Sequence, residues 1–166
     1  MSSTFTKTLE LLIDGGVELI VVGMASAIAQ GAPLTTMDLD IVHRRTPENV
    51  DRLLAVLTAI DAVYRTDRCN LAPGREALLG TGHQLLRTRV GIVDCLGAMA
   101  LGGVDLGYEE LLERSIVLHL DGREIRLLSL ATYIEAKRGA GRPKDLAVLP
   151  TLEATLREIQ ARARRA

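Results

Sequence analysis

The sequence predicts an α/β (α+β) fold in which helices flank a small mixed β-sheet. Short apolar runs rich in β-branched residues, among them ELIVV, MDLDIV and GIVDCL, alternate with longer segments of helical periodicity. Hydrophobic residues make up 48% of the chain and aromatic residues only 2%, so the core must consist mainly of Leu, Val, Ile and Ala. That composition favours strands buried between layers of helices.

Helices are predicted where apolar residues recur at helical spacing between capping or terminating residues: 6–13, 25–30, 47–57, 106–113, 130–138 and 143–164. Thr46 followed by Pro47 is a typical helix start, since proline fits the first helical position. Ser129 is expected to cap the helix that follows it. Pro150 is expected to kink or divide the last helix, because proline has no amide hydrogen to donate.

Strands are predicted at residues 18–22, 37–42, 62–65, 83–89, 91–96, 115–120 and 124–128. The last two are expected to pair as a hairpin around Asp121-Gly122, a dipeptide that is typical of tight two-residue turns. Residues 67–82 contain three Gly and one Pro, so this segment is expected to be largely loop and able to form a mobile flap.

A chain of 166 residues predicts one domain, residues 1–166, with a helical C-terminal segment from about residue 129. The formal net charge of −1 argues against a histone-like nucleic-acid binder. Cys69 and Cys95 are isolated, and neither a signal peptide nor a membrane span is evident, so a cytoplasmic location is expected. The arginines near the C-terminus, at positions 157, 162, 164 and 165, could contact RNA or simply form a solvated helix end.

Acidic residues on two of the predicted strands carry the main chemical signal. Asp38 and Asp40 alternate with apolar residues, so both carboxylates should leave the same face of their strand. Their mutual repulsion would raise a pKa unless a cation lies between them. Asp94, on another apolar strand, is a candidate third acid. Mg²⁺ (or Mn²⁺) prefers oxygen ligands, so these residues are the predicted catalytic and metal-binding set.

The segment VVGMASAIAQGAPLTTMDLDIV resembles the signature of the nucleotidyltransferase superfamily, in which a glycine turn precedes a threonine and an Asp-x-Asp pair. The later RTRVGIVDCLG is similar to the strand that supplies the third carboxylate in that superfamily. The C-terminal LLSLATYIEAKRGAGRPKDLAVL resembles a segment of minimal bacterial nucleotidyltransferases of the toxin-like AbiEii kind. The resemblance spans residues 18–149. It implies a nucleotidyltransferase-like fold.

By this resemblance, Asp38 and Asp40 would hold metal ions that bridge to the phosphates of a nucleoside triphosphate (NTP). Asp94 would bind the second metal and help to deprotonate the attacking hydroxyl. Gly23 would let the backbone approach the phosphates. The predicted nucleotide-binding residues are Gly23, Met24, Ser26, Thr36, Lys137 and Arg142.

Several of these residues have an alternative structural explanation. Gly23 could be a plain tight turn, and Lys137 could simply complement a helix dipole. Asp145 is expected to be a helix cap or an internal ion-pair partner. His43, His83 and His119 lack metal-ligand spacing and are interpreted as structural or surface residues.

The leading functional hypothesis is metal-dependent transfer of a nucleoside monophosphate from an NTP to a hydroxyl or phosphate acceptor. That acceptor could be tRNA, a protein side chain or a small molecule. The main alternative is an inactive nucleotidyltransferase-fold binding module that acts as a regulatory or toxin–antitoxin partner. A structural oligomerisation protein is a third alternative, and either a homodimer or a complex with a cognate antitoxin is compatible with the sequence.

Overall fold

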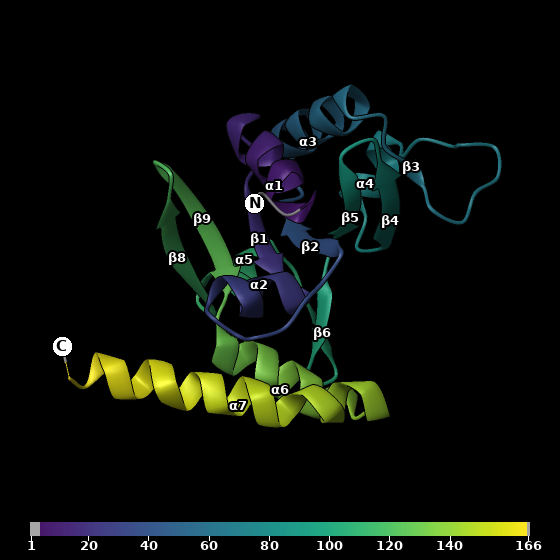
Figure 1. Cartoon of the computed structure of the whole chain (residues 1–166). Helices are drawn as coiled ribbons and strands as arrows, with labels where there is room; N and C mark the ends of the chain where they lie inside the picture. The colour runs from purple at the N-terminus through teal and green to yellow at the C-terminus, as the bar shows by residue number, and fades with distance from the viewer. Residues whose placement is uncertain (1–3, 166) are drawn as a thin grey trace.

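The computed structural model describes residues 4–165 and shows a central mixed sheet between two groups of helices (Figure 1). The strands are β1 Leu19–Val22, β2 Asp38–His43, β3 Val63–Tyr64, β4 His83–Thr88, β5 Gly91–Leu96, β6 Met99–Leu101, β7 Val104–Leu106, β8 Ser115–Leu120 and β9 Arg123–Leu128. The helices are α1 Thr4–Asp14, α2 Gly23–Ala29, α3 Pro47–Ala59, α4 Arg75–Leu79, α5 Tyr108–Leu112, α6 Leu130–Ala140 and α7 Pro143–Ala163.

The large sheet has seven strands in the order β3-β4-β5-β2-β1-β9-β8, and β6 pairs with β7 in a separate two-stranded ribbon. The β2–β5 and β1–β9 pairs are parallel, whereas β1–β2, β4–β5, β3–β4 and β8–β9 are antiparallel. The mixed sheet that the sequence predicts is therefore confirmed.

Alternation along the strands divides the core between the two faces of the sheet. Leu39 and Ile41 of β2 pack in a cluster with residues of α1, α3 and α4. Val42 of β2 and Val22 of β1 pack in a second cluster with α5, α6 and α7. Figure 1 shows these two helical groups on opposite sides of the sheet. Asp38 and Asp40 share the face of Val42 by strand periodicity, which places them on the side of α6 and α7.

Local sequence accounts for several element boundaries. The Thr46 side chain accepts a hydrogen bond from the Asn49 amide at the start of α3, and Ser129 accepts one from the Thr132 amide at the start of α6. The turn between β8 and β9 has positive φ at Asp121 and at Gly122, as a two-residue hairpin turn requires. The helix starts and the hairpin expected from the sequence are confirmed.

Residues 67–82 are largely loop, as predicted, although α4 forms inside them and buries Leu78 in the core. Two sequence-based predictions need correction. The predicted helix 106–113 begins only at Tyr108. The residues before it form the β6–β7 ribbon, whose turn has positive φ at Gly102 and Gly103. Pro150 does not divide α7, which continues through it while Leu152 packs in the core.

No helix within residues 4–165 is long and apolar enough to cross a lipid bilayer.

Candidate functional site

Two neighbouring strands bring three carboxylates to one face of the sheet. Asp38 and Asp40 are two residues apart on β2, so their side chains leave the same face. β5 runs parallel to β2, and the register aligns Asp40 with Asp94. Aligned residues on neighbouring strands lie about 4.8 Å apart and point to the same side. The sheet therefore unites the three acids selected from the sequence.

The guanidinium of Arg65 bridges two of these carboxylates. Its Nη2 donates to Asp94 Oδ2 at 2.7 Å, and its Nη1 donates to Asp38 Oδ2 at 3.2 Å. Arg65 directly follows β3, and its amide N–H donates to the Leu85 carbonyl oxygen on β4, which fixes its backbone beside the acidic strands. The Arg65 side chain is 26% exposed, so solvent reaches the bridge only in part.

Arg65 was not selected by the sequence analysis. No spacing rule links it to Asp38 or Asp94, which are far from it along the chain. Two features together could have suggested it. Three neighbouring acids need a counter-charge, and Arg65 is a basic residue at the end of a predicted strand.

Burial and like charges make ionisation of Asp40 and Asp94 costly. The pKa of Asp40 is raised to about 6, first by burial and then by the charges of Asp94 and Asp38, although Arg65 and Lys137 oppose this. Burial also raises the pKa of Asp94, with the neighbouring Arg65 acting in the opposite direction. Asp40 and Asp94 therefore retain a proton more readily than isolated aspartates would.

The donor chemistry of the site suits a divalent metal, but the present arrangement does not form a metal site. Asp94 is 7% exposed, and its Oδ1 is buried without a hydrogen-bond partner. Carboxylate oxygens, one of them unpaired, are the ligands that Mg²⁺ prefers. Nevertheless, residues 4–165 contain no group of three His, Cys, Asp or Glu placed to hold a metal ion. The Arg65 guanidinium instead lies between Asp38 and Asp94.

Gly23 makes room for the Asp40 carboxylate. It opens α2 with φ +64°, a left-handed conformation that favours glycine. A Cβ atom on Gly23 would lie 2.2 Å from Asp40 Oδ2, which is a severe overlap. A glycine is therefore required by both the backbone angle and the neighbouring acid, in addition to any approach of phosphates.

Two other predicted nucleotide-binding residues near β1 and β2, Ser26 and Thr36, make local hydrogen bonds. Ser26 is buried, and its hydroxyl donates to the Gly23 carbonyl oxygen at 2.8 Å. Thr36 Oγ1 accepts from the Asp38 amide at 3.3 Å and so supports the start of β2. Met24 is half-buried on α2 beside Gly23.

Asp40 and two basic residues line a cleft of about 510 Å³. The cleft is lined by residues of β1, α2, β2, β4, β5, β6 and α6, and by Arg142, which follows α6. The lining includes Gly23, Asp40, His83, Tyr133, Lys137 and Arg142. Phosphate groups are anionic, so a cleft lined by Asp40 together with Lys137 and Arg142 offers both a carboxylate for a metal ion and cationic groups for phosphate.

Asp145 holds the two basic residues in place. Its carboxylate accepts a hydrogen bond from Lys137 Nζ at 2.6 Å and another from Arg142 Nε. The Asp145 side chain is 1% exposed, and these bonds, that from Arg142 first, lower its pKa to about 2. Lys137 Nζ also lies 5.2 Å from the centre of the Tyr133 ring. The prediction that Asp145 is an internal ion-pair partner is confirmed.

The histidines differ in their surroundings. His43 is fully buried, and its Nε2 is 2.7 Å from the Leu78 carbonyl oxygen, so its structural interpretation holds. His119 is on the exposed hairpin. His83, although exposed, lines the acidic cleft. The sequence analysis did not foresee that position, because only the β4–β5 pairing brings His83 there.

Comparison with known proteins finds similarity at the level of structure. No protein-family model matches the sequence, and no curated protein matches it either. A protein of Thermotoga maritima, provisionally assigned as a nucleotidyltransferase, aligns with a TM-score of 0.55 and 19% identity over 92% of this chain and 89% of its own. The antibiotic-resistance factor ANT(2'')-Ia aligns in its solution structure with a TM-score of 0.56 and 13% identity over 99% and 96% of the two chains.

A crystal structure of ANT(2'')-Ia in complex with adenylyl-2''-tobramycin aligns with a TM-score of 0.57 and 15% identity over 96% and 95% of the two chains. The chain has the nucleotidyltransferase fold. These alignments support the resemblance stated from the sequence at the level of the fold, whereas the finer AbiEii-like assignment stays a prediction.

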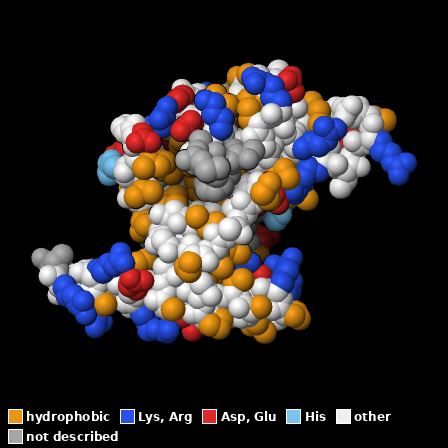
Figure 2. All heavy atoms as spheres, viewed as in Figure 1, with side chains coloured by type: hydrophobic (Ala, Val, Ile, Leu, Met, Phe, Trp, Pro, Cys, Tyr) orange, Lys and Arg blue, Asp and Glu red, His pale blue; other side chains and the backbone are white. Residues whose placement is uncertain are grey.

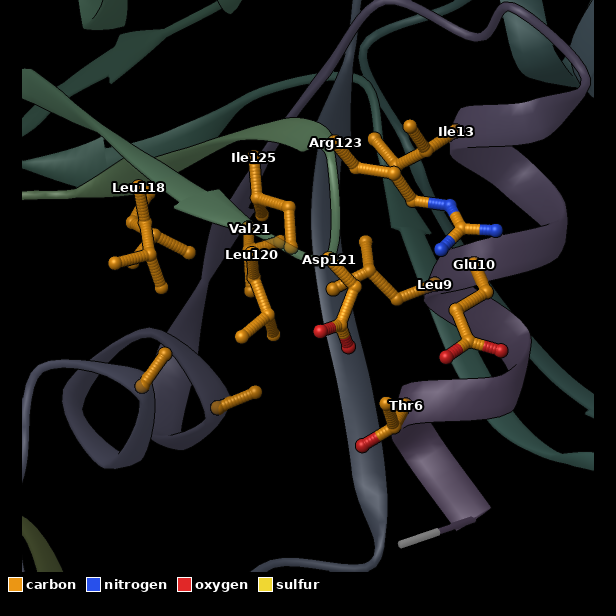
Figure 3. Close-up of a pocket in the computed structure, with 13 residues that line it drawn as sticks. Thr6, Leu9, Glu10, Ile13, Val21, Leu118, Leu120, Asp121, Arg123 and Ile125 are labelled. Carbon is orange, nitrogen blue, oxygen red and sulfur yellow. The ribbon is translucent and has the colours of Figure 1, made fainter. Parts of the chain in front are cut away.

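A second cavity of this nucleotidyltransferase fold lies away from the acids. It measures about 360 Å³ and lies between α1, α2 and the β8–β9 hairpin. Figure 3 shows apolar side chains such as Leu9, Val21 and Ile125 pointing into it, with Glu10 and Arg123 at its rim. Val21 leaves the sheet face opposite to Val22, so this cavity is on the other side of the sheet from Asp40.

Proposed function

We propose that this chain transfers a nucleoside monophosphate from an NTP to a hydroxyl group of a small-molecule acceptor, with Mg²⁺ or Mn²⁺. The observation that carries the proposal is the alignment of Asp40 with Asp94, with Asp38 on the same face, and the position of Asp40 in a cleft that Lys137 and Arg142 also line. The nucleotidyltransferase fold adds support.

The proposed roles follow from the chemistry of each side chain. Asp38 and Asp40 would hold the divalent ion, which would neutralise charge on the phosphates. Lys137 and Arg142 would bind the triphosphate from the other side of the cleft. Asp94, whose Oδ1 is buried without a hydrogen-bond partner, would hold a divalent ion beside Asp38 and would also receive the proton of the attacking hydroxyl.

In the proposed reaction, the acceptor oxygen forms a bond to the α-phosphorus while the bond from that phosphorus to the bridging oxygen of the β-phosphate breaks. Pyrophosphate leaves, and the acceptor's proton passes to Asp94. Positioning and charge neutralisation would supply most of the acceleration.

A small acceptor is proposed because ANT(2'')-Ia, similar over nearly the whole length of both chains, is described in complex with adenylyl-2''-tobramycin. An RNA acceptor has less support. Figure 2 shows blue Lys and Arg side chains crowded at the C-terminal end of α7 (lower left), mixed with acidic ones. Arg162 there pairs with Glu158, and α7 separates it from Arg142 by about 30 Å.

Label transfer tests this proposal. The protein would be incubated with each α-³²P-labelled NTP in the presence of Mg²⁺ or Mn²⁺. Three acceptor pools would be tested separately: a panel of aminoglycosides and other polyols, total RNA, and cell protein. We expect a labelled small molecule and stoichiometric pyrophosphate, both absent with Asp40→Asn. Label appearing in RNA or protein instead would reject the small acceptor, and no label from any NTP would reject transfer.

An inactive binding module is the second candidate, and the Arg65 bridge favours it, because Arg65 occupies the acids that a metal would need. Such a module would show a melting temperature that rises with NTP and metal, but no release of pyrophosphate. A toxin role, a cognate antitoxin and a homodimer stay predictions from the sequence.

A further inference from the structure

Arg65 occupies the position in which a cation is needed. Three carboxylates share one sheet face, and the guanidinium contacts two of them, at 2.7 Å and 3.2 Å. The remaining oxygen of Asp94, Oδ1, is buried and unpaired. A guanidinium can donate to only part of this set, because its N–H groups lie in one plane. The cluster is therefore incompletely neutralised and has an unused ligand atom.

We propose that Arg65 and a divalent cation occupy the Asp38–Asp94 position in alternation, so that metal binds only when the Arg65 bridge opens. The inference rests on the proposed function, since it assumes that these acids bind metal. It gives Arg65 a role that neither the sequence nor the fold assigns, which is to keep the acids paired until metal and nucleotide arrive together.

The position of Arg65 in the fold suits such an exchange. Arg65 follows β3, a two-residue strand that pairs with β4 and forms one edge of the sheet. Its side chain is partly exposed, whereas that of Asp94 is 10% exposed. The arginine can therefore swing toward solvent while the buried acid stays in place. The segment that follows Arg65 has a hydrogen bond of its own, from the Leu71 amide to Asp67 Oδ2. This bond does not involve the Arg65 side chain.

Competition of this kind lowers the apparent metal affinity. If the open form is only about one-tenth populated, the apparent dissociation constant rises about tenfold above its intrinsic value. A bound triphosphate offers the Arg65 guanidinium another anionic partner and so favours the open bridge, so nucleotide should restore metal affinity in the wild type. That restoration is a coupling between two ligands, mediated by one arginine.

Direct Mn²⁺ binding without nucleotide tests the exchange. Free Mn²⁺ would be followed by its electron paramagnetic resonance signal in titrations of wild type, Arg65→Met and Arg65→Lys. The matched control is Arg75→Met, which removes the same side chain from an exposed pair with Asp51, 2.6 Å long and outside the cleft. Circular dichroism melts would establish that each variant is folded, and Arg65→Lys keeps the charge if Arg65→Met does not fold.

We expect Arg65→Met to bind Mn²⁺ about tenfold more tightly than wild type, and Arg65→Lys to fall between them, while Arg75→Met matches wild type. A non-hydrolysable NTP should tighten Mn²⁺ binding strongly in wild type and much less in Arg65→Met. Equal or weaker binding by folded Arg65 variants, or no binding by any protein, would overturn the exchange. Tighter binding without nucleotidyl transfer to any acceptor would support the exchange and reject the proposed enzyme.

Discussion

Asp40 and Asp94 lie side by side in the parallel register of β2 and β5, and Asp40 has the more strongly perturbed pKa. The two residues are far apart in sequence, yet their carboxyl groups leave the same face of neighbouring strands. Burial raises the pKa of both residues, and the charge of Asp94 raises that of Asp40 further. This relationship is the basis of the proposed chemistry and of the first prediction.

Asp40→Asn should stabilise the folded protein at neutral pH. The pKa of Asp40 in the folded state is raised from 3.8 to about 6. The protonated side chain therefore contributes stability that is fully present below pH 3.8 and is lost as pH rises through 6. The neutral amide avoids this loss, which amounts to about 3 kcal/mol at most. Urea unfolding should show the gain at pH 8 and none at pH 4, whereas Asp61→Asn, at a 77% exposed side chain, should change little at either pH. A gain confined to pH 4 would contradict the prediction.

Asp145→Asn should destabilise the protein at neutral pH. The folded-state pKa is lowered from 3.8 to about 2, so its stabilisation is present above pH 3.8 and is lost as pH falls through 2. The substitution should cost about 2 kcal/mol at pH 7, because the buried carboxylate accepts hydrogen bonds from both Lys137 and Arg142. Chemical denaturation measures the loss. Glu158→Gln, at an exposed pair with Arg162, should cost less than about 0.5 kcal/mol, and equal losses would refute the role given to Asp145.

Gly23→Ala should be more harmful than an alanine at another left-handed glycine. Gly23 has φ +64° and Gly102 has φ +60°, so both alanines carry a similar backbone penalty, of about 1 kcal/mol. Only the Gly23 Cβ would meet Asp40 Oδ2, whereas nothing lies within 4 Å of a Cβ at Gly102. Thermal melts should therefore show a loss at least about 1 kcal/mol larger for Gly23→Ala. The same loss for both variants would show that Asp40 moves aside without cost.

Lys137→Met should weaken NTP binding about tenfold, because it removes a positive charge that lines the acidic cleft. Arg138→Met is the matched control: the neighbouring Arg138 is 61% exposed and pairs with Glu153 instead. Fluorescence anisotropy of a labelled NTP analogue with Mg²⁺ would measure both affinities. Equal weakening by the two variants would show that general positive charge, rather than the place of Lys137, attracts the nucleotide.

The amino-acid sequence by itself determined the strands of the large sheet, the acids and much of the helical pattern, because these depend on local periodicity and capping. It did not predict the β6–β7 ribbon. The alternation in MDLDIV is enough to put Asp38 and Asp40 on one face, and Thr46 and Ser129 cap helices through contacts within a few residues. The resemblance in the glycine turn and the acidic pair led to the fold that the structural comparisons support.

Tertiary structure alone decided which groups meet those acids. Strand order places Asp94 beside Asp40, the edge strand β3 delivers Arg65 to the acids, and α6 places Lys137 across the cleft. Tertiary packing also buries Leu78, so that part of a Gly-rich segment forms α4. It packs α7 against the core as well, and that helix continues through Pro150. These outcomes depend on burial and on charges brought together from distant parts of the chain, and short-range periodicity contains no information about either.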